Sequence, residues 1–79
     1  MNNLEKYNNA FIETFDISTN DLNGLKYQDI PAWDSIGHMS LVAALEDSFE
    51  VMLDADDIID MSSYEKGMEI LAKNYGVEF

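Results

Sequence analysis

Residues 34–49 have the sequence Asp34-Ser35-Ile36-Gly37-His38-Met39-Ser40-Leu41-Val42-Ala43-Ala44-Leu45-Glu46-Asp47-Ser48-Phe49. At about 100° per residue, one face of an α-helix collects His38, Leu41, Val42, Leu45 and Phe49. Asp and Ser are both favoured as the cap of a helix N-terminus. This stretch therefore predicts a helix that begins at Asp34-Ser35, ends near Phe49 or Glu50, and buries that face in the core.

The opposite face of this predicted helix mixes apolar and acidic side chains. Its apolar members are Ile36, Met39 and Ala43, and its acidic members are Glu46, Asp47 and Glu50. An exposed apolar patch can mark a partner-binding surface. Single exposed apolar residues are also common and need no function. From the residues alone, both interpretations remain open.

Three further helices are predicted on either side of this stretch. Residues 3–15 carry apolar side chains at three- and four-residue steps, which predicts an amphipathic helix. Residues 54–61 have room for one or two turns, and their acids suit the positive end of a helix. The last helix is predicted to follow Ser62, the N-cap of a capping box completed by Glu65, and to end at Gly76. Gly67 within it indicates close packing against a neighbouring helix.

The connection over residues 16–34 is long and contains helix-discouraging residues such as Asn23-Gly24 and Pro31. Its apolar residues recur regularly, which predicts an ordered loop strapped across the core with a short helical turn near residues 21–25. The chain shows no strand pattern and no internal repeat. We therefore predict an all-α fold of four helices in a single domain, residues 1–79.

The charge of the chain is its strongest compositional feature. Sixteen acidic residues face four lysines, giving a net charge of −12, which argues against nucleic acid as a partner because phosphates require cationic contacts. The acids either form a solvated face or dock basic partners. No apolar run approaches the roughly 20 residues of a membrane span, and residues 1–6 show no secretory leader. We expect a cytoplasmic monomer that does not insert into membranes.

No residue set typical of catalysis or metal binding is visible. The single histidine, His38, is placed on the core side of its helix and is expected to be packed there. Ser35 lies three residues before it, but no oriented base or oxyanion hole accompanies the pair. The acids at Asp54, Asp56 and Asp57 lack the glycine and ligand spacing of a calcium loop. We therefore expect neither an enzyme nor a metal site.

Ser35 itself has two interpretations. It can be an ordinary residue of a helix start, where Asp34-Ser35 contributes about 1 kcal/mol by capping. A helix start also presents unpaired N–H groups and a positive dipole end, which suit a phosphate ester. A serine that carries a phosphodiester would be well placed here.

Residues 34–49 resemble the phosphopantetheine-attachment region of acyl carrier proteins. That motif is Asp-Ser-(Leu/Ile), four further residues, a Leu-Val-like pair and an ending of the form Ala-Leu-Glu-(Glu/Asp)-x-Phe. The likeness extends along the whole chain, with a first amphipathic helix, a long loop, the Asp-Ser helix, a short third helix and a last helix after Ser-Ser. The resemblance implies a four-helix bundle of acyl-carrier type with a long loop between helices one and two and a short third helix.

The resemblance also implies a function. A phosphopantetheinyl transferase would attach 4′-phosphopantetheine from coenzyme A to the hydroxyl of Ser35, beside the motif residue Asp34. The thiol of that arm would carry acyl groups as thioesters, supplying the sulfur that this cysteine-free chain lacks. The domain would be a tether that raises the effective concentration of its cargo at successive enzymes.

The resemblance further implies how partners and cargo are held. Acyl-activating and acyl-transferring enzymes of such systems present basic patches to the second helix. By that analogy the docking surface has an apolar centre of Ile36, Met39 and Ala43 and an acidic rim of Glu46, Asp47 and Glu50. The interior between the helices would shelter part of an acyl chain, with Met61, Leu45 and Phe49 as candidate lining.

The motif departs from that of the commonest carriers of fatty acid biosynthesis. Those have Gly-Ala-Asp-Ser-Leu-Asp, whereas this chain has Ala32-Trp33-Asp34-Ser35-Ile36-Gly37. The difference favours a stand-alone carrier of a specialised pathway. Two alternatives remain: an aminoacyl or peptidyl carrier, which has the same arm but tends to be less acidic, and an unmodified acidic helical adaptor in which Ser35 only caps a helix.

Overall fold

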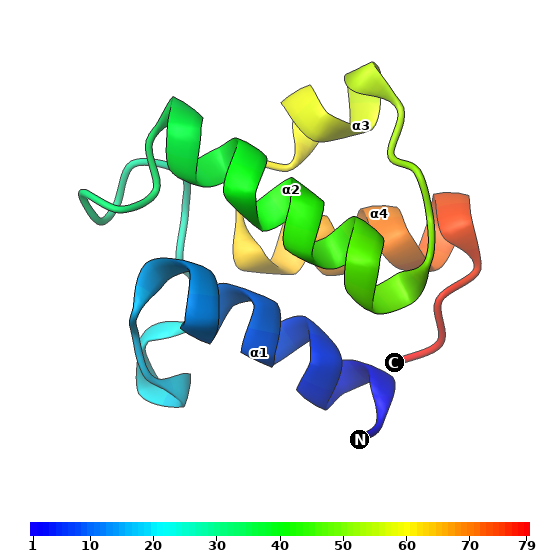
Figure 1. The fold of residues 1–79 in the computed structure, drawn as a ribbon, viewed down its shortest axis with the longest axis horizontal. Helices are drawn as coiled ribbons and strands as arrows, with labels where there is room; N and C mark the ends of the chain where they lie inside the picture. The colour runs from blue at the N-terminus through cyan, green and yellow to red at the C-terminus, as the bar shows by residue number, and fades with distance from the viewer.

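The computed structural model describes residues 1–79 as helices joined by loops (Figure 1). The four α-helices are α1 (Asn3–Phe15), α2 (Ser35–Phe49), α3 (Ala55–Asp60) and α4 (Tyr64–Tyr75). A 3₁₀ turn, η1 (Thr19–Asp21), lies in the long connection between α1 and α2. The predicted all-α class, with a long first loop and a short third helix, is confirmed. None of the helices combines the length and the apolar character needed to cross a membrane.

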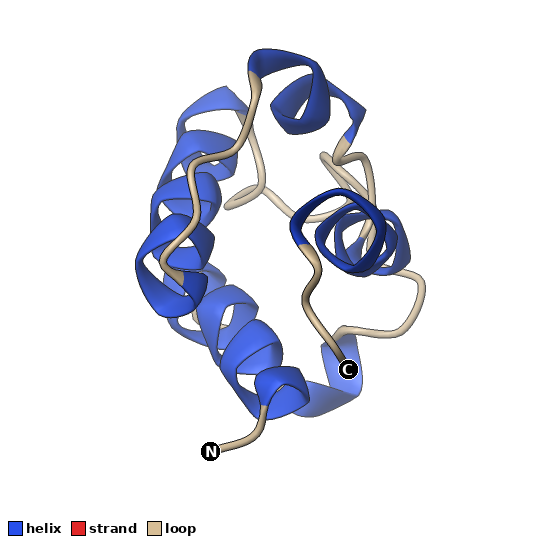
Figure 2. Cartoon of the chain, turned by 90° about the vertical axis from the view of Figure 1, so that its right-hand side faces the viewer, coloured by secondary structure: helices blue, strands red, loops and turns tan.

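The helices enclose one hydrophobic core. Helices α1 and α2 lie side by side and run in opposite directions (Figure 1). A view from the side shows the helices around a common interior (Figure 2), which a single cluster of fifteen buried side chains fills. The chain ends are also tied together, because the side-chain amide of Asn3 donates to the carbonyl of Glu78 at 2.9 Å.

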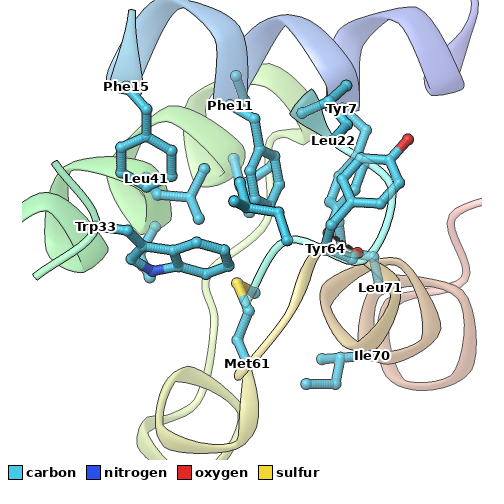
Figure 3. Packing of buried hydrophobic residues seen from close by; sticks show 14 of the residues in the cluster. Tyr7, Phe11, Phe15, Leu22, Trp33, Leu41, Met61, Tyr64, Ile70 and Leu71 are labelled. Carbon is cyan, nitrogen blue, oxygen red and sulfur yellow. Dashed lines mark hydrogen bonds between the residues drawn. The ribbon is translucent and has the colours of Figure 1, made fainter. Parts of the chain in front are cut away.

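Trp33 anchors the long loop in this core. Phe11 and Phe15 of α1 point towards it (Figure 3), with ring centroids 5.5 and 5.3 Å from its indole. Trp33 is completely buried. Aromatic pairs at such distances contribute about 0.5–1.5 kcal/mol each beyond the area they bury. The loop is therefore anchored in the core two residues before Ser35.

The predicted inner face of α2 is confirmed: its middle residues are fully buried, and the residues at its two ends are partly exposed. Leu41, Val42 and Leu45 are buried, whereas His38 and Phe49 are only half-buried. Phe49 lies at the last turn of α2 and packs on the edge of the core, with its ring centroid 6.1 Å from that of Phe79. Its position at the end of the helix explains why solvent reaches part of the ring.

The predicted cap of the last helix is wrong by one residue. The N-cap of α4 is Ser63, whose hydroxyl accepts a hydrogen bond from the N–H of Lys66 at 3.0 Å. Ser62 cannot take this position because residues 62–64 are held extended against residues 25–27, with the N–H of Tyr27 donating to the carbonyl of Ser62 and the N–H of Tyr64 to that of Leu25. Glu65 instead accepts from the N–H of Gly24 at 2.9 Å.

The same contacts explain the path of the long loop. Leu22, Leu25 and Trp33 are buried, so the loop is ordered across the core as predicted. Its helical turn lies at Thr19–Asp21, slightly earlier than the predicted position near residues 21–25. The close packing predicted at Gly67 is confirmed, because a side chain there would overlap the hydroxyl of Tyr7.

Candidate functional site

Ser35 is the first residue of α2 and is exposed. Asp34 caps the helix, and its Oδ1 accepts from the N–H of Gly37 at 2.8 Å, while the N–H of His38 donates to the Asp34 carbonyl. The N–H groups of Ser35 and Ile36 have no hydrogen-bond partner within the chain. These two groups and the positive end of the helix dipole together favour an anionic group at this point.

The loop before Ser35 lies tightly against the first turn of α2. A Cβ added to Gly37 would overlap the carbonyl of Ala32 and come within 3.3 Å of the Phe15 ring. A side chain at position 37 would therefore push the loop away. The glycine therefore lets the loop lie close enough to α2 for Trp33 to be buried while Ser35, two residues later, is exposed.

Tyr27 reaches the site from the long loop, although it lies outside the motif of residues 34–49. Its hydroxyl lies 3.1 Å from Oγ of Ser35, at hydrogen-bond distance. The ring of Tyr27 packs edge-on against Trp33 and His38, with centroid separations of 6.3 and 5.6 Å. The residues lie eight positions apart across a loop, and no sequence signal predicts that they meet.

His38 links α2 to α3 and to the loop. The indole N–H of Trp33 donates to Nδ1 of His38 at 2.9 Å, and Nε2 of His38 lies 2.7 Å from the carbonyl oxygen of Ile58. An indole can only donate and a carbonyl can only accept, so this network assigns the proton to Nε2 of a neutral ring. Both ring nitrogens are thereby engaged away from Ser35. The predicted packed role of His38 is confirmed.

An apolar groove of about 370 Å³ lies beside Ser35, between α2 and α3. Its lining is Tyr27, Ser35, His38, Met39, Ile58, Ile59, Met61 and Ser62. Of the three residues predicted to line an interior space, only Met61 does so. Leu45 is fully buried in the core and Phe49 lies at the far end of α2. The prediction was wrong for these two because helical periodicity shows that a residue faces inward but not whether a space remains beside it.

The predicted docking surface is exposed in its apolar centre. Ile36 is 80% and Met39 is 53% exposed, and Ala43 is exposed as well. Asp47 and Glu50 are exposed beside them. These residues therefore lie together on the outer face of α2 and are available for contact.

Glu46, predicted as part of the acidic rim of the docking surface, also has a structural role. It is half-buried, and its Oε2 accepts from the N–H of Leu53 at 2.9 Å. It thus holds the connection between α2 and α3 in place. The two salt bridges of the chain join Lys66 and Lys73 to Glu69 on α4. The acids of α2 and α3 are consequently free of lysine partners.

Comparison with known proteins identifies no relative of this chain. No protein-family model matches the chain, and neither curated proteins nor solved structures show significant similarity to it. The functional inference therefore depends on the site itself and on the motif resemblance.

Proposed function

We propose that this protein is an acyl carrier whose Ser35 bears a 4′-phosphopantetheine arm. The observation that carries the proposal is the exposed hydroxyl of Ser35 at the first position of α2, next to two unpaired N–H groups and an apolar groove. Coenzyme A is the donor for such an arm, and a phosphopantetheinyl transferase would attach it. The proposal includes a monomer located in the cytoplasm, where coenzyme A and the transferase meet the chain.

The residues at the site fit a phosphodiester. The N–H groups of Ser35 and Ile36 are donors for anionic oxygens, and no acidic side chain is bonded to the Ser35 hydroxyl. Asp34 stays engaged with the N–H of Gly37, which keeps the helix start closed and the hydroxyl outside. The arm, when bound, supplies a thiol for thioester chemistry. The apolar groove beside Ser35 supports an acyl cargo.

The outer face of α2 is proposed as the docking surface for basic partner enzymes. Its support is the exposed apolar centre at Ile36, Met39 and Ala43 within a strongly acidic chain. Complementary charge steers association and raises its rate at low salt. Acidity of this degree also favours the acyl carrier over the aminoacyl or peptidyl carrier, and the motif departures favour a specialised pathway.

The direct test is intact mass after incubation with coenzyme A, magnesium and a broad-specificity phosphopantetheinyl transferase. The wild-type chain should gain one phosphopantetheine, and peptide mapping should locate it on Ser35. Ser35→Ala should gain nothing while remaining folded, because Asp34 still caps the helix. Ser40→Ala removes an exposed hydroxyl from the same helix and should load normally.

Two outcomes would contradict the proposal. Loading of Ser35→Ala would mean that the acceptor is another residue. Absence of loading in a folded wild-type sample, with several transferases, would favour the unmodified adaptor. Circular dichroism of each sample distinguishes a failure to load from a failure to fold.

A further inference from the structure

We propose that Tyr27 is a positioning residue for Ser35: its hydroxyl donates a hydrogen bond that orients Oγ for modification and afterwards binds the phosphodiester. This inference rests on the proposed function. It concerns a residue that lies on the long loop, outside the motif of residues 34–49, and that only the folded chain brings to Ser35.

The backbone and the ring of Tyr27 are both held in place, and this fixes the position of its hydroxyl. The N–H of Tyr27 donates to the carbonyl of Ser62 at 2.9 Å, which ties its backbone to the start of α4. Its ring lies edge-on to Trp33 and His38 at 89° and 78°. Those two rings are themselves joined by the hydrogen bond from the indole to Nδ1. A phenol supported in this way loses little further freedom when it binds a neighbour.

The direction of the hydrogen bond follows from the chemistry of the two hydroxyls. Either oxygen can donate in the free protein. A phenol O–H is more acidic than the O–H of an aliphatic alcohol and is therefore the better donor. With Tyr27 as donor, the proton of Ser35 points away from the loop and is accessible to a base of the transferase. The hydrogen bond also restricts rotation of the Ser35 side chain, whose orientation would otherwise be set only by rotamer preference.

The modification step is a phosphoryl transfer in which all groups are accounted for. Oγ of Ser35 forms a bond to the phosphorus of the phosphopantetheine moiety of coenzyme A, and the phosphoanhydride bond of coenzyme A breaks. The proton of Ser35 passes to the base of the transferase, and 3′,5′-adenosine bisphosphate leaves with the electron pair. Orientation of the attacking oxygen lowers the barrier of such a step.

The same donor stays useful after the transfer. Once esterified, Oγ has no proton and can only accept, and the new phosphodiester oxygens are acceptors too. Tyr27 can donate to any of them, whereas a role as acceptor from Ser35 would be lost with the serine proton. Tyr27 also lines the groove between α2 and α3. Its hydrogen bond therefore fixes the base of the arm at the mouth of that groove.

The test compares wild type with Tyr27→Phe and Tyr75→Phe. Tyr27→Phe removes the hydroxyl and keeps the ring packing. Tyr75→Phe removes a hydroxyl that donates to Asp57 and accepts from the N–H of Asp54, outside the groove beside Ser35, and serves as the matched control. We expect kcat for the transferase to fall about tenfold in Tyr27→Phe, the loss of a single directional hydrogen bond, with KM unchanged. Tyr75→Phe should match wild type.

A second measurement addresses the modified chain. After prolonged incubation to complete loading, the ³¹P resonance of the phosphodiester should shift in Tyr27→Phe relative to wild type and to Tyr75→Phe. Equal kcat and an unshifted resonance would overturn the inference, as would a change confined to KM. Those results leave the proposed function intact, because wild type loads. Failure of wild type to gain mass would instead reject the carrier function, and the role of Tyr27 with it.

Discussion

At the scale of single residues, Gly37 and Trp33 determine that Ser35 is exposed at the start of α2. Trp33 is completely buried and Ser35 is exposed, with Asp34 capping the helix between them. This abrupt change from core to surface requires the loop to approach α2 closely. The approach occurs where Gly37 lies against the carbonyl of Ala32.

Gly37→Ala should therefore destabilise the protein. Alanine gains up to about 1 kcal/mol in helix propensity, but the new methyl group overlaps a backbone oxygen that cannot rotate away. Overpacking costs about 1–3 kcal/mol, and a clash with a backbone oxygen lies at the upper end of that range. We therefore expect a net loss of about 2 kcal/mol in the free energy of unfolding. Urea denaturation measures it, with Ser40→Ala as the exposed control on α2. A Gly37→Ala variant as stable as wild type would show that the loop is free to move.

At the scale of the element, α2 separates two roles on opposite faces. Leu41, Val42 and Leu45 fill the core, while Ile36 and Met39 remain exposed. The acidic residues are divided as well. Glu46 supports the connection to α3 through the N–H of Leu53, so its substitution would disturb the fold. Asp47 is exposed and its carboxylate makes no hydrogen bond or salt bridge within the chain, which makes it the better probe of docking.

Asp47→Lys should slow association with a phosphopantetheinyl transferase. An exposed charge interaction of about 1 kcal/mol corresponds to a rate about fivefold lower at low salt. The dependence of that rate on ionic strength should also weaken. Asp56→Lys makes the same change in charge at an exposed position on α3, outside the outer face of α2, and is the control. Equal effects of the two variants in stopped-flow measurements would mean that only the net charge matters and that α2 is not the docking face.

At the scale of the whole molecule, the helices are joined by tyrosine hydroxyls. Tyr7 of α1 donates to the carbonyl of Tyr64 at 2.6 Å, and Tyr64 donates to Asn8. Tyr75 of α4 donates to Asp57 of α3 at 2.6 Å. Burial raises the pKa of Tyr7 far above its usual value, and the neighbouring Tyr64 and Glu65 raise it further. The fold therefore depends on a neutral Tyr7.

The protein should lose stability at alkaline pH. The unfolded chain releases the Tyr7 proton near pH 10, whereas the folded chain retains it. Stability from this group is complete below about pH 10 and is lost as pH rises above it, at up to about 1.4 kcal/mol per pH unit. Urea denaturation between pH 8 and 11 measures the slope. Tyr7→Phe should be less stable at pH 8 and show a smaller slope, whereas equal slopes would exclude Tyr7 as the cause.

The sequence by itself determined the helices, the two faces of α2 and the position of Ser35 at a helix start. These features depend on periodicity and on capping within a few residues, which are local properties of the chain. The prediction failed for the cap of α4, because Ser62 is engaged by the distant loop, and for Leu45 and Phe49 as lining of an interior space.

Only the tertiary structure decided which side chains surround Ser35. Tyr27 meets Ser35 because residues 25–27 are bonded to residues 62–64, which directs the loop over the start of α2. His38 is engaged by Trp33 and Ile58, and Glu46 by Leu53. Such pairs join segments whose approach depends on the path of the loops and on the packing of the core. Local sequence preferences carry no information about that approach, so the neighbours of Ser35 became visible only in the folded chain.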